Sequence, residues 1–206
     1  MNREGKIIVF EGIDQSGKGT QSKIFTDRLK NIGFDVGCMH FHDIETPLGK
    51  EIQLFLEGKR KYSPIVRQLL FAANRYEKHE YIESMVKKKD YVIIDRYIPS
   101  GLAYGMVNGI DLNWMIQMES MLYQPDLVIL IDISSRISMQ RKSEETRDVY
   151  EKDLIFLDKV REAYLNLAKM FDWIIVNGEG SLEEIHNNIW RNAWEILNGK
   201  GEKTKK

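Results

Sequence analysis

Short apolar runs rich in β-branched residues recur along the chain, separated by longer segments with helical spacing. Three of the runs, residues 7–9, 92–94 and 128–131, are continuously apolar, which is typical of strands covered by helices on both faces. The pattern predicts strands at Ile7 to Phe10, Phe34 to Phe41, Tyr91 to Ile94, Leu127 to Ile131 and Trp173 to Val176. It predicts helices at Lys18 to Asn31, Pro64 to Lys88, Leu112 to Tyr123, Tyr150 to Met170 and Leu182 to Leu197.

This alternation of strands and helices predicts the α/β class, with a three-layer, doubly wound, parallel five-stranded sheet. Gly33, Gly109 and Gly178 lie in turn segments, and the sequence has no linker rich in Pro or Ser and no internal repeat. We therefore expect a single domain over residues 1–198. Residues 199–206 carry four Lys and one Glu without apolar anchors, so we expect a disordered basic tail there.

The composition argues against several function classes. Lys and Arg number 30 and Asp and Glu 31 among 206 residues, so the net charge of −1 provides no basic field for nucleic acid or an anionic membrane. The single cysteine, Cys38, excludes an internal disulfide framework and a zinc site with several thiolates, which favours a reducing compartment and a cytoplasmic location. No stretch approaches the roughly 20 apolar residues of a membrane span.

The strongest chemical signal is a glycine-rich segment between the first predicted strand and the first predicted helix, where a phosphate cradle is expected. Backbone N–H groups, the helix N-terminus and Lys18 together predict binding of ATP phosphates. Gly19 replaces the usual Ser or Thr after the lysine, so we expect the metal to be held mainly by phosphates and water. No guanine-reading Asn-Lys-x-Asp segment is found, which disfavours a regulatory GTPase. The predicted ATP site comprises Gly12, Ile13, Asp14, Gln15, Ser16, Gly17, Lys18, Gly19 and Thr20.

A second candidate site lies on the helix predicted over residues 64–88. Its apolar stripe includes Ile65 and Leu69, whereas Phe71 falls on the opposite face with Arg75 one turn later. A nucleobase could stack on the Phe71 ring while Arg75 donates a hydrogen bond to its exocyclic oxygen. From the pattern alone, an exposed Phe covered by another element is an equally good interpretation.

The third predicted strand runs directly into Asp95 and Arg96. Ligands of doubly wound sheets bind outside the carboxyl ends of the strands, so both side chains are expected near the phosphate loop. Asp95 can hold Mg²⁺ through a bound water, and Arg96 can bind a phosphate with two N–H groups. Asp132, after the fourth predicted strand, is the competing metal candidate. We prefer Asp95 because the two serines after Asp132 look like a helix cap.

Six sequence blocks, spread in order over nearly the whole chain, resemble the thymidylate kinase family. They are FEGID at 10–14, TPLG at 46–49, LFAANRY at 70–76, DRYIPSGLAY at 95–104, PDL at 125–127 and VREAY at 160–164. The resemblance implies a P-loop nucleotide kinase fold with a short lid. It also implies transfer of the ATP γ-phosphate to dTMP, giving dTDP and ADP with Mg²⁺ required, by a homodimer whose expected contact region is Met106 to Met121.

The resemblance further assigns roles in the acceptor site. The residues matching Phe71 and Arg75 stack on thymine and contact its O4, in agreement with the helical-face argument. The remaining assignments are Asp14 to the deoxyribose 3′-hydroxyl, Arg96 to the acceptor phosphate, Ser100 to the base region, Tyr104 to the wall that disfavours a ribose 2′-hydroxyl, and Tyr150 to the acceptor sugar.

Residues 136–150 are rich in basic side chains, including Arg136, Arg141, Lys142 and Arg147. By charge pattern alone a solvated helix end is the more ordinary interpretation, but the resemblance predicts a lid that closes over phosphates. Gln15 stands where some members carry an arginine. We therefore expect the catalytic arginine to be Arg141 or Arg147, beside Lys18, Asp95 and Arg96.

Two further departures concern turnover and substrate range. Val149 stands where the family often has an arginine, and residues 41–45 lack the arginine that many members place against the acceptor phosphate. Either His42 or Lys50 compensates, or the affinity for the acceptor is lower. Two other hypotheses stay open: a kinase for another nucleoside monophosphate, since residues 17–21 also resemble adenylate kinases, and an ATP-binding module whose transfer activity has decayed.

Overall fold

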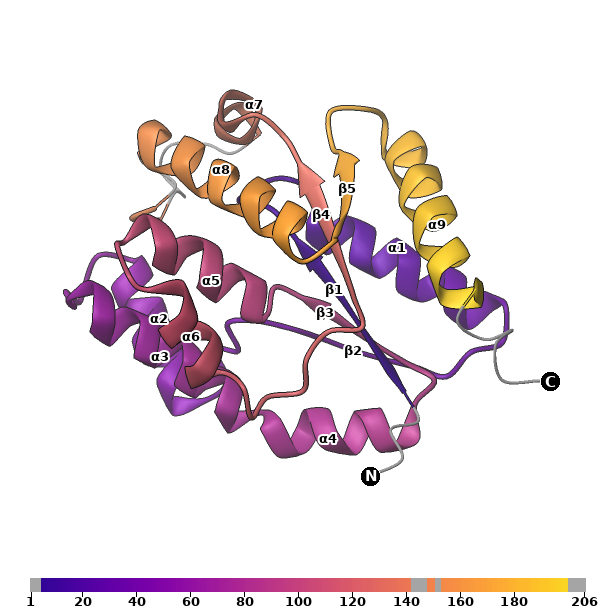
Figure 1. The fold of residues 1–206 in the computed structure, drawn as a ribbon, viewed down its shortest axis with the longest axis horizontal. Coiled ribbons are helices and arrows are strands. Elements are labelled where there is room, and N and C mark those ends of the chain that lie inside the picture. The colour runs from indigo at the N-terminus through magenta and orange to yellow at the C-terminus, as the bar shows by residue number, and fades with distance from the viewer. Residues whose placement is uncertain (1–4, 142–147, 151–152, 200–206) are drawn as a thin grey trace.

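The computed structural model describes residues 5–141, 148–150 and 153–199. In this part of the chain, five parallel strands form one sheet in the order β2-β3-β1-β4-β5 (Figure 1). The strands are β1 (Lys6–Glu11), β2 (Val36–His40), β3 (Tyr91–Asp95), β4 (Leu127–Asp132) and β5 (Ile174–Asn177). The chain passes from central β1 to the edge strand β2, returns to β3 beside β1, and then crosses to β4 and the other edge strand, β5, so the predicted doubly wound parallel sheet is confirmed.

Helices cover both faces of the sheet and complete the three predicted layers (Figure 1). Helices α1 and α9 pack on one face, and α4, α5 and α8 pack on the other. The helices are α1 (Lys18–Asn31), α2 (Pro47–Leu56), α3 (Pro64–Glu77), α4 (His79–Lys88), α5 (Ile98–Val107), α6 (Leu112–Met118), α7 (Ser135–Gln140), α8 (Leu154–Met170) and α9 (Leu182–Gly199).

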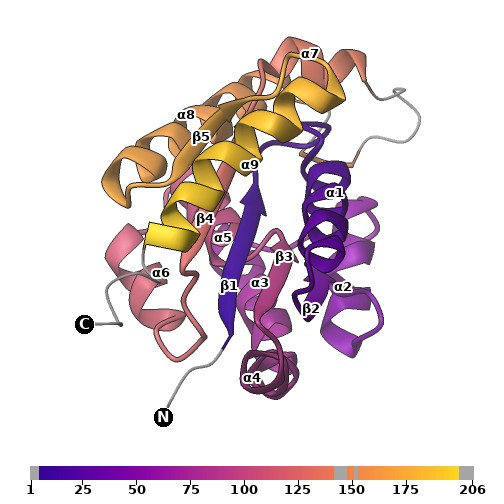
Figure 2. The same cartoon turned by 90° about the vertical axis from the view of Figure 1, so that its right-hand side faces the viewer.

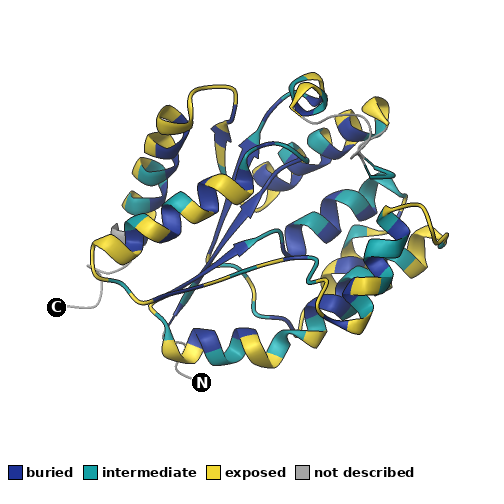
Figure 3. Cartoon of the chain, turned by 180° about the vertical axis from the view of Figure 1, so that it is seen from behind, coloured by how far each residue is buried: buried dark blue, intermediate teal, exposed yellow. Residues whose placement is uncertain are grey.

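Successive side chains of β1 enter two different cores. Ile7 and Val9 face the layer of α4, α5 and α8, whereas Ile8 and Phe10 face α1 and α9, and all four are fully buried. The inner strands β1, β3 and β4 are buried over almost their whole length, whereas the edge strands β2 and β5 have exposed residues. Figure 3 also shows that most helices expose one face. Burial on both sides explains why the inner strands are continuously apolar.

The prediction over residues 64–88 is wrong in two respects. Ile65 and Leu69 of its apolar stripe are 47% and 45% exposed, whereas Arg75 on the opposite face is buried. The segment is also two helices rather than one. α3 ends at Glu77 and α4 begins at His79, with Lys78 between them. α4 packs into the core through Ile82 and Met85, whereas α3 borders the cavity described below. The two helices therefore bury different faces, which a single straight helix could not do.

Three observed helices, α2, α5 and α7, had no counterpart in the sequence pattern. α2 begins after Thr46, whose hydroxyl accepts a hydrogen bond from the Gly49 N–H at 3.0 Å, and has Pro47 in its first turn. α5 is buried or apolar around most of its surface, so it shows no amphipathic period. α8 begins at Leu154 rather than at Tyr150. No helix among the described residues is long and apolar enough to cross a bilayer.

All five strands are parallel, so their carboxyl ends lie at the same edge of the sheet. Figure 2 shows β1 pointing away from the chain termini toward the loop that precedes α1. Glu11, Asp95 and Asp132 are the last residues of β1, β3 and β4. The topology therefore gathers carboxylates from three separate strands around the candidate phosphate loop.

Candidate active site

The glycine-rich loop connects β1 directly to α1. Gly17, with a φ of 92°, precedes Lys18, and no described side chain caps the helix N-terminus. The first N–H groups of α1 are therefore left for an anion, as a phosphate site requires. The Lys18 ammonium is buried, 3.4 Å from the Ile13 carbonyl oxygen and 3.6 Å from the Asp14 carboxylate. Burial and the neighbouring Arg96 charge lower the pKa of Lys18.

Asp95 approaches this loop at Gly19, the position where Ser or Thr is usual. A Cβ atom on Gly19 would lie 2.9 Å from Asp95 Oδ2, closer than ordinary van der Waals contact. The Asp95 carboxylate thus lies directly beside the backbone of the phosphate loop at this position. Asp95 Oδ1 is buried and has no hydrogen-bond partner among the described residues. An unpaired buried carboxylate oxygen beside a phosphate loop fits a hydrated Mg²⁺.

Asp132, the competing candidate for the metal, is engaged elsewhere. Its two carboxylate oxygens accept hydrogen bonds from Arg161 Nε and Nη2 at 2.6 and 2.8 Å. Ser134 is the N-cap residue of α7, as its sequence context suggested. The structure therefore favours Asp95 over Asp132.

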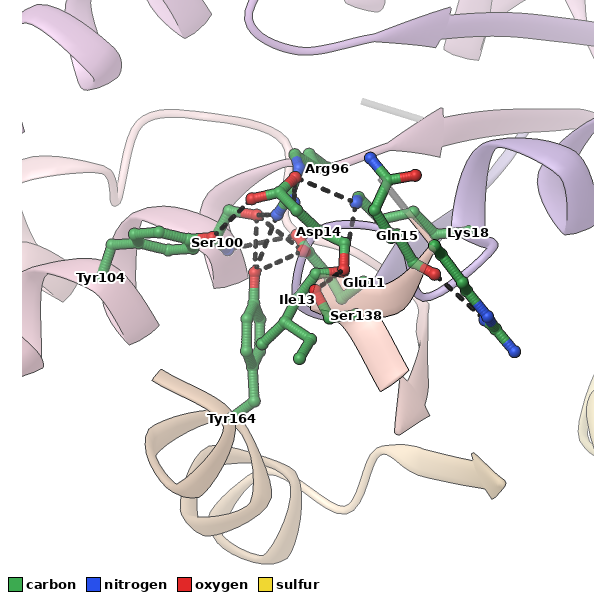
Figure 4. A network of polar contacts seen from close by, with 11 residues as sticks. Glu11, Ile13, Asp14, Gln15, Lys18, Arg96, Ser100, Tyr104, Ser138 and Tyr164 are labelled. Carbon is green, nitrogen blue, oxygen red and sulfur yellow. Dashed lines mark hydrogen bonds and ion pairs between the residues drawn. The ribbon is translucent and has the colours of Figure 1, made fainter. Parts of the chain in front are cut away.

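Arg96 joins the end of β3 to the phosphate loop (Figure 4). Its backbone has a left-handed φ of 62°, an uncommon conformation for a residue other than glycine and one that clusters at functional sites. Nη2 donates to Asp14 Oδ1 at 2.5 Å, and Nη1 donates to the hydroxyls of Ser100 and Tyr164 at 3.1 and 3.3 Å. The Tyr104 hydroxyl donates to the second oxygen of Asp14 at 3.1 Å.

The charged groups in this network shift one another's pKa values. Burial alone would raise the pKa of Asp14, but Arg96 and Lys18 outweigh it and hold this pKa well below its usual range. Burial would lower the pKa of Arg96, but Asp14 raises it well above normal. Burial and the Asp14 charge raise the pKa of Tyr104, so its phenol keeps its proton and donates. Arg96 is consequently a permanent cation at the sheet edge.

Glu11, the last residue of β1, accepts hydrogen bonds from several members of this network. It was not assigned a role from the sequence. Its fully buried carboxylate accepts hydrogen bonds from the backbone N–H groups of Tyr97 and Ser100 at 2.8 and 3.1 Å. It also accepts from the hydroxyls of Ser100 and Tyr164 at 2.6 and 3.0 Å. Burial raises the pKa of Glu11 despite these donors. The one feature of the sequence that could have indicated a role for Glu11 is a carboxylate directly after the buried apolar residues of β1.

A cavity of about 190 Å³ opens beside this network. Its lining contains all seven residues predicted for acceptor binding: Asp14, Phe71, Arg75, Arg96, Ser100, Tyr104 and Tyr150. His42 also lines it, with its ring edge-on to Phe71, whereas Lys50 is exposed and is not among the described lining residues. Of the two candidates for the missing arginine, His42 alone therefore has the required location.

Two charged residues in or beside this cavity were not assigned a role from the sequence. Arg67 lines it and donates to the Asn108 side-chain oxygen at 2.8 Å and the Tyr150 hydroxyl at 3.3 Å. Glu119 lies behind the cavity and forms a buried ion pair with Arg75. Both contacts join residues more than 40 positions apart, so no local motif indicates them.

The predicted lid is described only in part. Arg141, directly after α7, donates to the carbonyl oxygens of Gln15 and Gly178, each at 3.0 Å, and the Ser138 hydroxyl donates to the Asp14 carbonyl oxygen at 2.7 Å. α7 therefore contacts the phosphate loop, and Arg141 is near enough to serve it. Arg147 lies outside the described residues. Closure of residues 136–150 as a lid stays a prediction.

Comparison with known proteins supports the same identity. A sequence profile described as thymidylate kinase matches residues 10–189. Thymidylate kinase from Plasmodium falciparum is 35% identical over 196 residues, covering 94% of this chain and 92% of the relative. A probable thymidylate kinase from Thermococcus onnurineus is 39% identical over 193 residues, covering 88% and 94%. The solved structure of thymidylate kinase from Candida albicans matches with a TM-score of 0.80 at 27% identity, covering 98% of this chain and 94% of that one.

These similarities confirm the family and the fold class that the six sequence blocks indicated. The profile covers most of the chain, and both sequence relatives exceed 30% identity over nearly their full length. The phosphate loop, the strand-end arginine and the aromatic cavity are the features expected of a phosphotransferase. The chain belongs to the thymidylate kinase family of nucleoside monophosphate kinases.

Proposed function

We propose that this protein transfers the γ-phosphoryl group of ATP to dTMP, giving dTDP and ADP. The observation that carries the proposal is a single cavity lined by Phe71, Arg75 and Arg96, in which Arg96 is bonded to Asp14 of the phosphate loop. An aromatic ring with a nearby donor suits a pyrimidine carbonyl, and a permanent cation suits the acceptor phosphate.

The proposed reaction asks for positioning more than for covalent chemistry by the protein. An oxygen of the dTMP phosphate attacks the γ-phosphorus, the bond from that phosphorus to the ADP oxygen breaks, and no proton has to be removed from the acceptor. Lys18 and the N-terminus of α1 hold the donor phosphates, while Arg96 neutralises the acceptor phosphate. Both cations stand beside Asp14, so one carboxylate sets their spacing.

Mg²⁺ belongs to this proposal with Asp95 as its protein partner. The described residues contain no cluster of three or more His, Cys, Asp or Glu that could hold a metal ion, so phosphates and water would supply the other ligands. When bound, the ion would neutralise charge on the donor phosphates. The unpaired Oδ1 of Asp95 is free to accept a hydrogen bond from a metal-bound water.

Asp95→Asn is therefore expected to raise the Mg²⁺ concentration for half-maximal activity by about tenfold or more, because an amide accepts that hydrogen bond less strongly than a carboxylate. Titration of Mg²⁺ at saturating ATP and dTMP measures the effect. Asp90→Asn, before β3 and away from the phosphate loop, is the control. An unchanged Mg²⁺ dependence in Asp95→Asn would remove Asp95 from the metal site.

The function itself is tested by incubating the protein with ATP and Mg²⁺ and each of dTMP, dUMP, dCMP, AMP, GMP and CMP, and following diphosphate formation. We expect dTDP to form preferentially. Preference for another acceptor would keep the kinase and overturn the base assignment. ATP binding without any product would favour the decayed module instead.

A homodimer also belongs to the proposal. Exposed apolar side chains gather on α3 and around α6, two helices that both pack on α5. Leu69 is 45% exposed and Met121 is 79% exposed, and Trp114 and Ile116 add to this surface. Large apolar side chains exposed together indicate an interaction surface. The sequence-based region Met106 to Met121 covers the α6 half of it.

Met121→Glu is expected to shift the protein from dimer to monomer, since burying a charged side chain in an apolar interface removes it from water at an energetic cost. Sedimentation velocity at several protein concentrations measures the shift. Ile196→Glu on α9, on the opposite face of the sheet, is the matched control and should leave the mass unchanged. A wild-type protein that sediments as a monomer would refute the dimer.

We place the protein in the cytoplasm as part of the same proposal. Cys38 is the only cysteine in the sequence and is an exposed free thiol at β2. A free thiol of this kind is ordinary in a reducing compartment. Localisation of a tagged protein by microscopy or cell fractionation tests the assignment.

A further inference from the structure

We propose that Glu119 is a positioning residue that sets the guanidinium of Arg75 against the acceptor base and thereby favours pyrimidines with a 4-oxo group over those with a 4-amino group. The inference deepens the proposed function and rests on it, since it concerns how the same cavity selects its acceptor. Glu119 itself is not among the described residues that line this cavity.

The Arg75–Glu119 pair has the geometry of a rigid fork. Arg75 Nε donates to Oε2 at 2.7 Å and Nη2 donates to Oε1 at 2.6 Å. The two side chains are only 3% and 1% exposed, which excludes water as a competing partner. Two parallel charge-assisted bonds fix both the position and the plane of a guanidinium. Nη1 takes no part in this pair, and it is the nitrogen left to meet a ligand.

The surrounding backbone leaves the pair no alternative position. A Cβ atom on Gly101 of α5 would lie 2.6 Å from Arg75 Nη2 and 3.1 Å from Glu119 Oε1, so only glycine lets the pair pack there. A second link lies beside the first, because the hydroxyl of Tyr76, which follows Arg75, donates to the carbonyl oxygen of Met118, which precedes Glu119, at 2.7 Å. α3, α5 and the end of α6 thus hold Arg75 from three sides.

This arrangement fixes the direction of the Arg75 donors and balances the positive charge of the guanidinium with the negative charge of Glu119. An unpaired arginine in the cavity would attract any anion, but Glu119 cancels its charge and occupies two of its nitrogens. Arginine has donors and no acceptor, so its remaining N–H groups match a carbonyl oxygen such as O4 of thymine or uracil. An exocyclic amino group would place donor against donor. Sites built around one such hydrogen bond reject the mismatched analogue strongly.

Glu119→Gln tests the inference because it keeps the shape of the side chain and removes the charge. We expect the KM for dTMP to rise about tenfold and the preference for dTMP over dCMP in kcat/KM to fall by about tenfold or more. The KM for ATP should stay within about twofold, since the phosphate loop is not touched. Glu119→Asp, which keeps the charge but withdraws the carboxylate, should shift both values in the same direction by less.

Tyr76→Phe is the matched control. It breaks the neighbouring bond between the same two helices, and Tyr76 is not among the described residues that line the cavity. If Glu119 only joined α3 to α6, Tyr76→Phe and Glu119→Gln would change acceptor selection alike. We expect Tyr76→Phe to lower the melting temperature while leaving the dTMP to dCMP preference unchanged.

A double-mutant cycle shows whether Glu119 acts through Arg75. In an Arg75→Met background, Glu119→Gln should produce no further change in the KM for dTMP. An equal effect in both backgrounds, or an unchanged preference in folded Glu119→Gln and Glu119→Asp proteins, would overturn the inference. The proposed function is judged separately, by dTDP formation in the wild-type protein, so failure of one is not mistaken for failure of the other.

Discussion

Lys18→Met is expected to lower kcat/KM for dTDP formation by about 10³-fold or more, because it removes the cation that holds the donor phosphates as charge develops on them. The ammonium lies at the start of α1, buried among the loop backbone and 3.6 Å from Asp14, so no nearby exposed lysine can replace it. The methionine chain fills similar volume, which keeps the loop packed. The loss should therefore appear in the rate of transfer rather than in folding.

Coupled measurement of ADP release and direct measurement of dTDP test this result, with the melting temperature as a check on folding. Lys23→Met removes an exposed lysine from the same helix and should retain full activity. A Lys18→Met protein as active as the wild type would contradict every kinase interpretation of this chain. Loss of activity in both variants would point to damage of α1 instead.

Arg96→Met is expected to lower kcat/KM for dTMP by about 10²- to 10³-fold, mostly through a higher KM for dTMP, because the acceptor phosphate loses its cation. The same change leaves the Asp14 carboxylate without its closest partner, and the pKa of Asp14 should rise toward its ordinary value. The contribution of this ion pair to stability is present above the ordinary pKa of Asp and is lost as the pH falls through the depressed one. Arg96→Met should therefore reduce stability at neutral pH.

The double variant Arg96→Met with Asp14→Asn separates these two effects. Removal of both charges should restore much of the melting temperature, since no unpaired carboxylate remains, while dTMP use stays low. Arg191→Met, at an exposed position of α9, is the control for the loss of one positive charge and should behave as the wild type. An Arg96→Met enzyme with an unchanged KM for dTMP would place the acceptor phosphate elsewhere.

The sequence pattern predicted the sheet better than the helices. Strands buried on both sides are continuously apolar, so β1, β3 and β4 were recognisable within one or two residues. α5 escaped recognition because burial on most sides removes the amphipathic period, and α2 because its N-terminal signals at Thr46 and Pro47 were not interpreted as a helix start. The break at Lys78 follows from two different packing partners, which periodicity along one helix does not specify.

For the site, the sequence indicated the candidate residues whose chemistry depends on their near neighbours in the chain. The phosphate loop with Lys18, the strand-end pair Asp95 and Arg96, and the helical face of Phe71 and Arg75 each depend on residues close together in the chain, where spacing and backbone geometry are informative. The six blocks also indicated the family, which the comparisons confirm.

Only the tertiary structure shows which side chains bind and orient these candidate site residues. Glu11 meets Ser100 and Tyr164 across 89 and 153 positions, and Glu119 meets Arg75 across 44. Such partners come from different strands and helices, and their meeting depends on strand order and helix packing rather than on any local motif. The same packing brings Asp95, at the end of another strand, beside Gly19 of the phosphate loop. Local sequence therefore determined the chemistry of the site, and three-dimensional packing decided how its charges are oriented and paired.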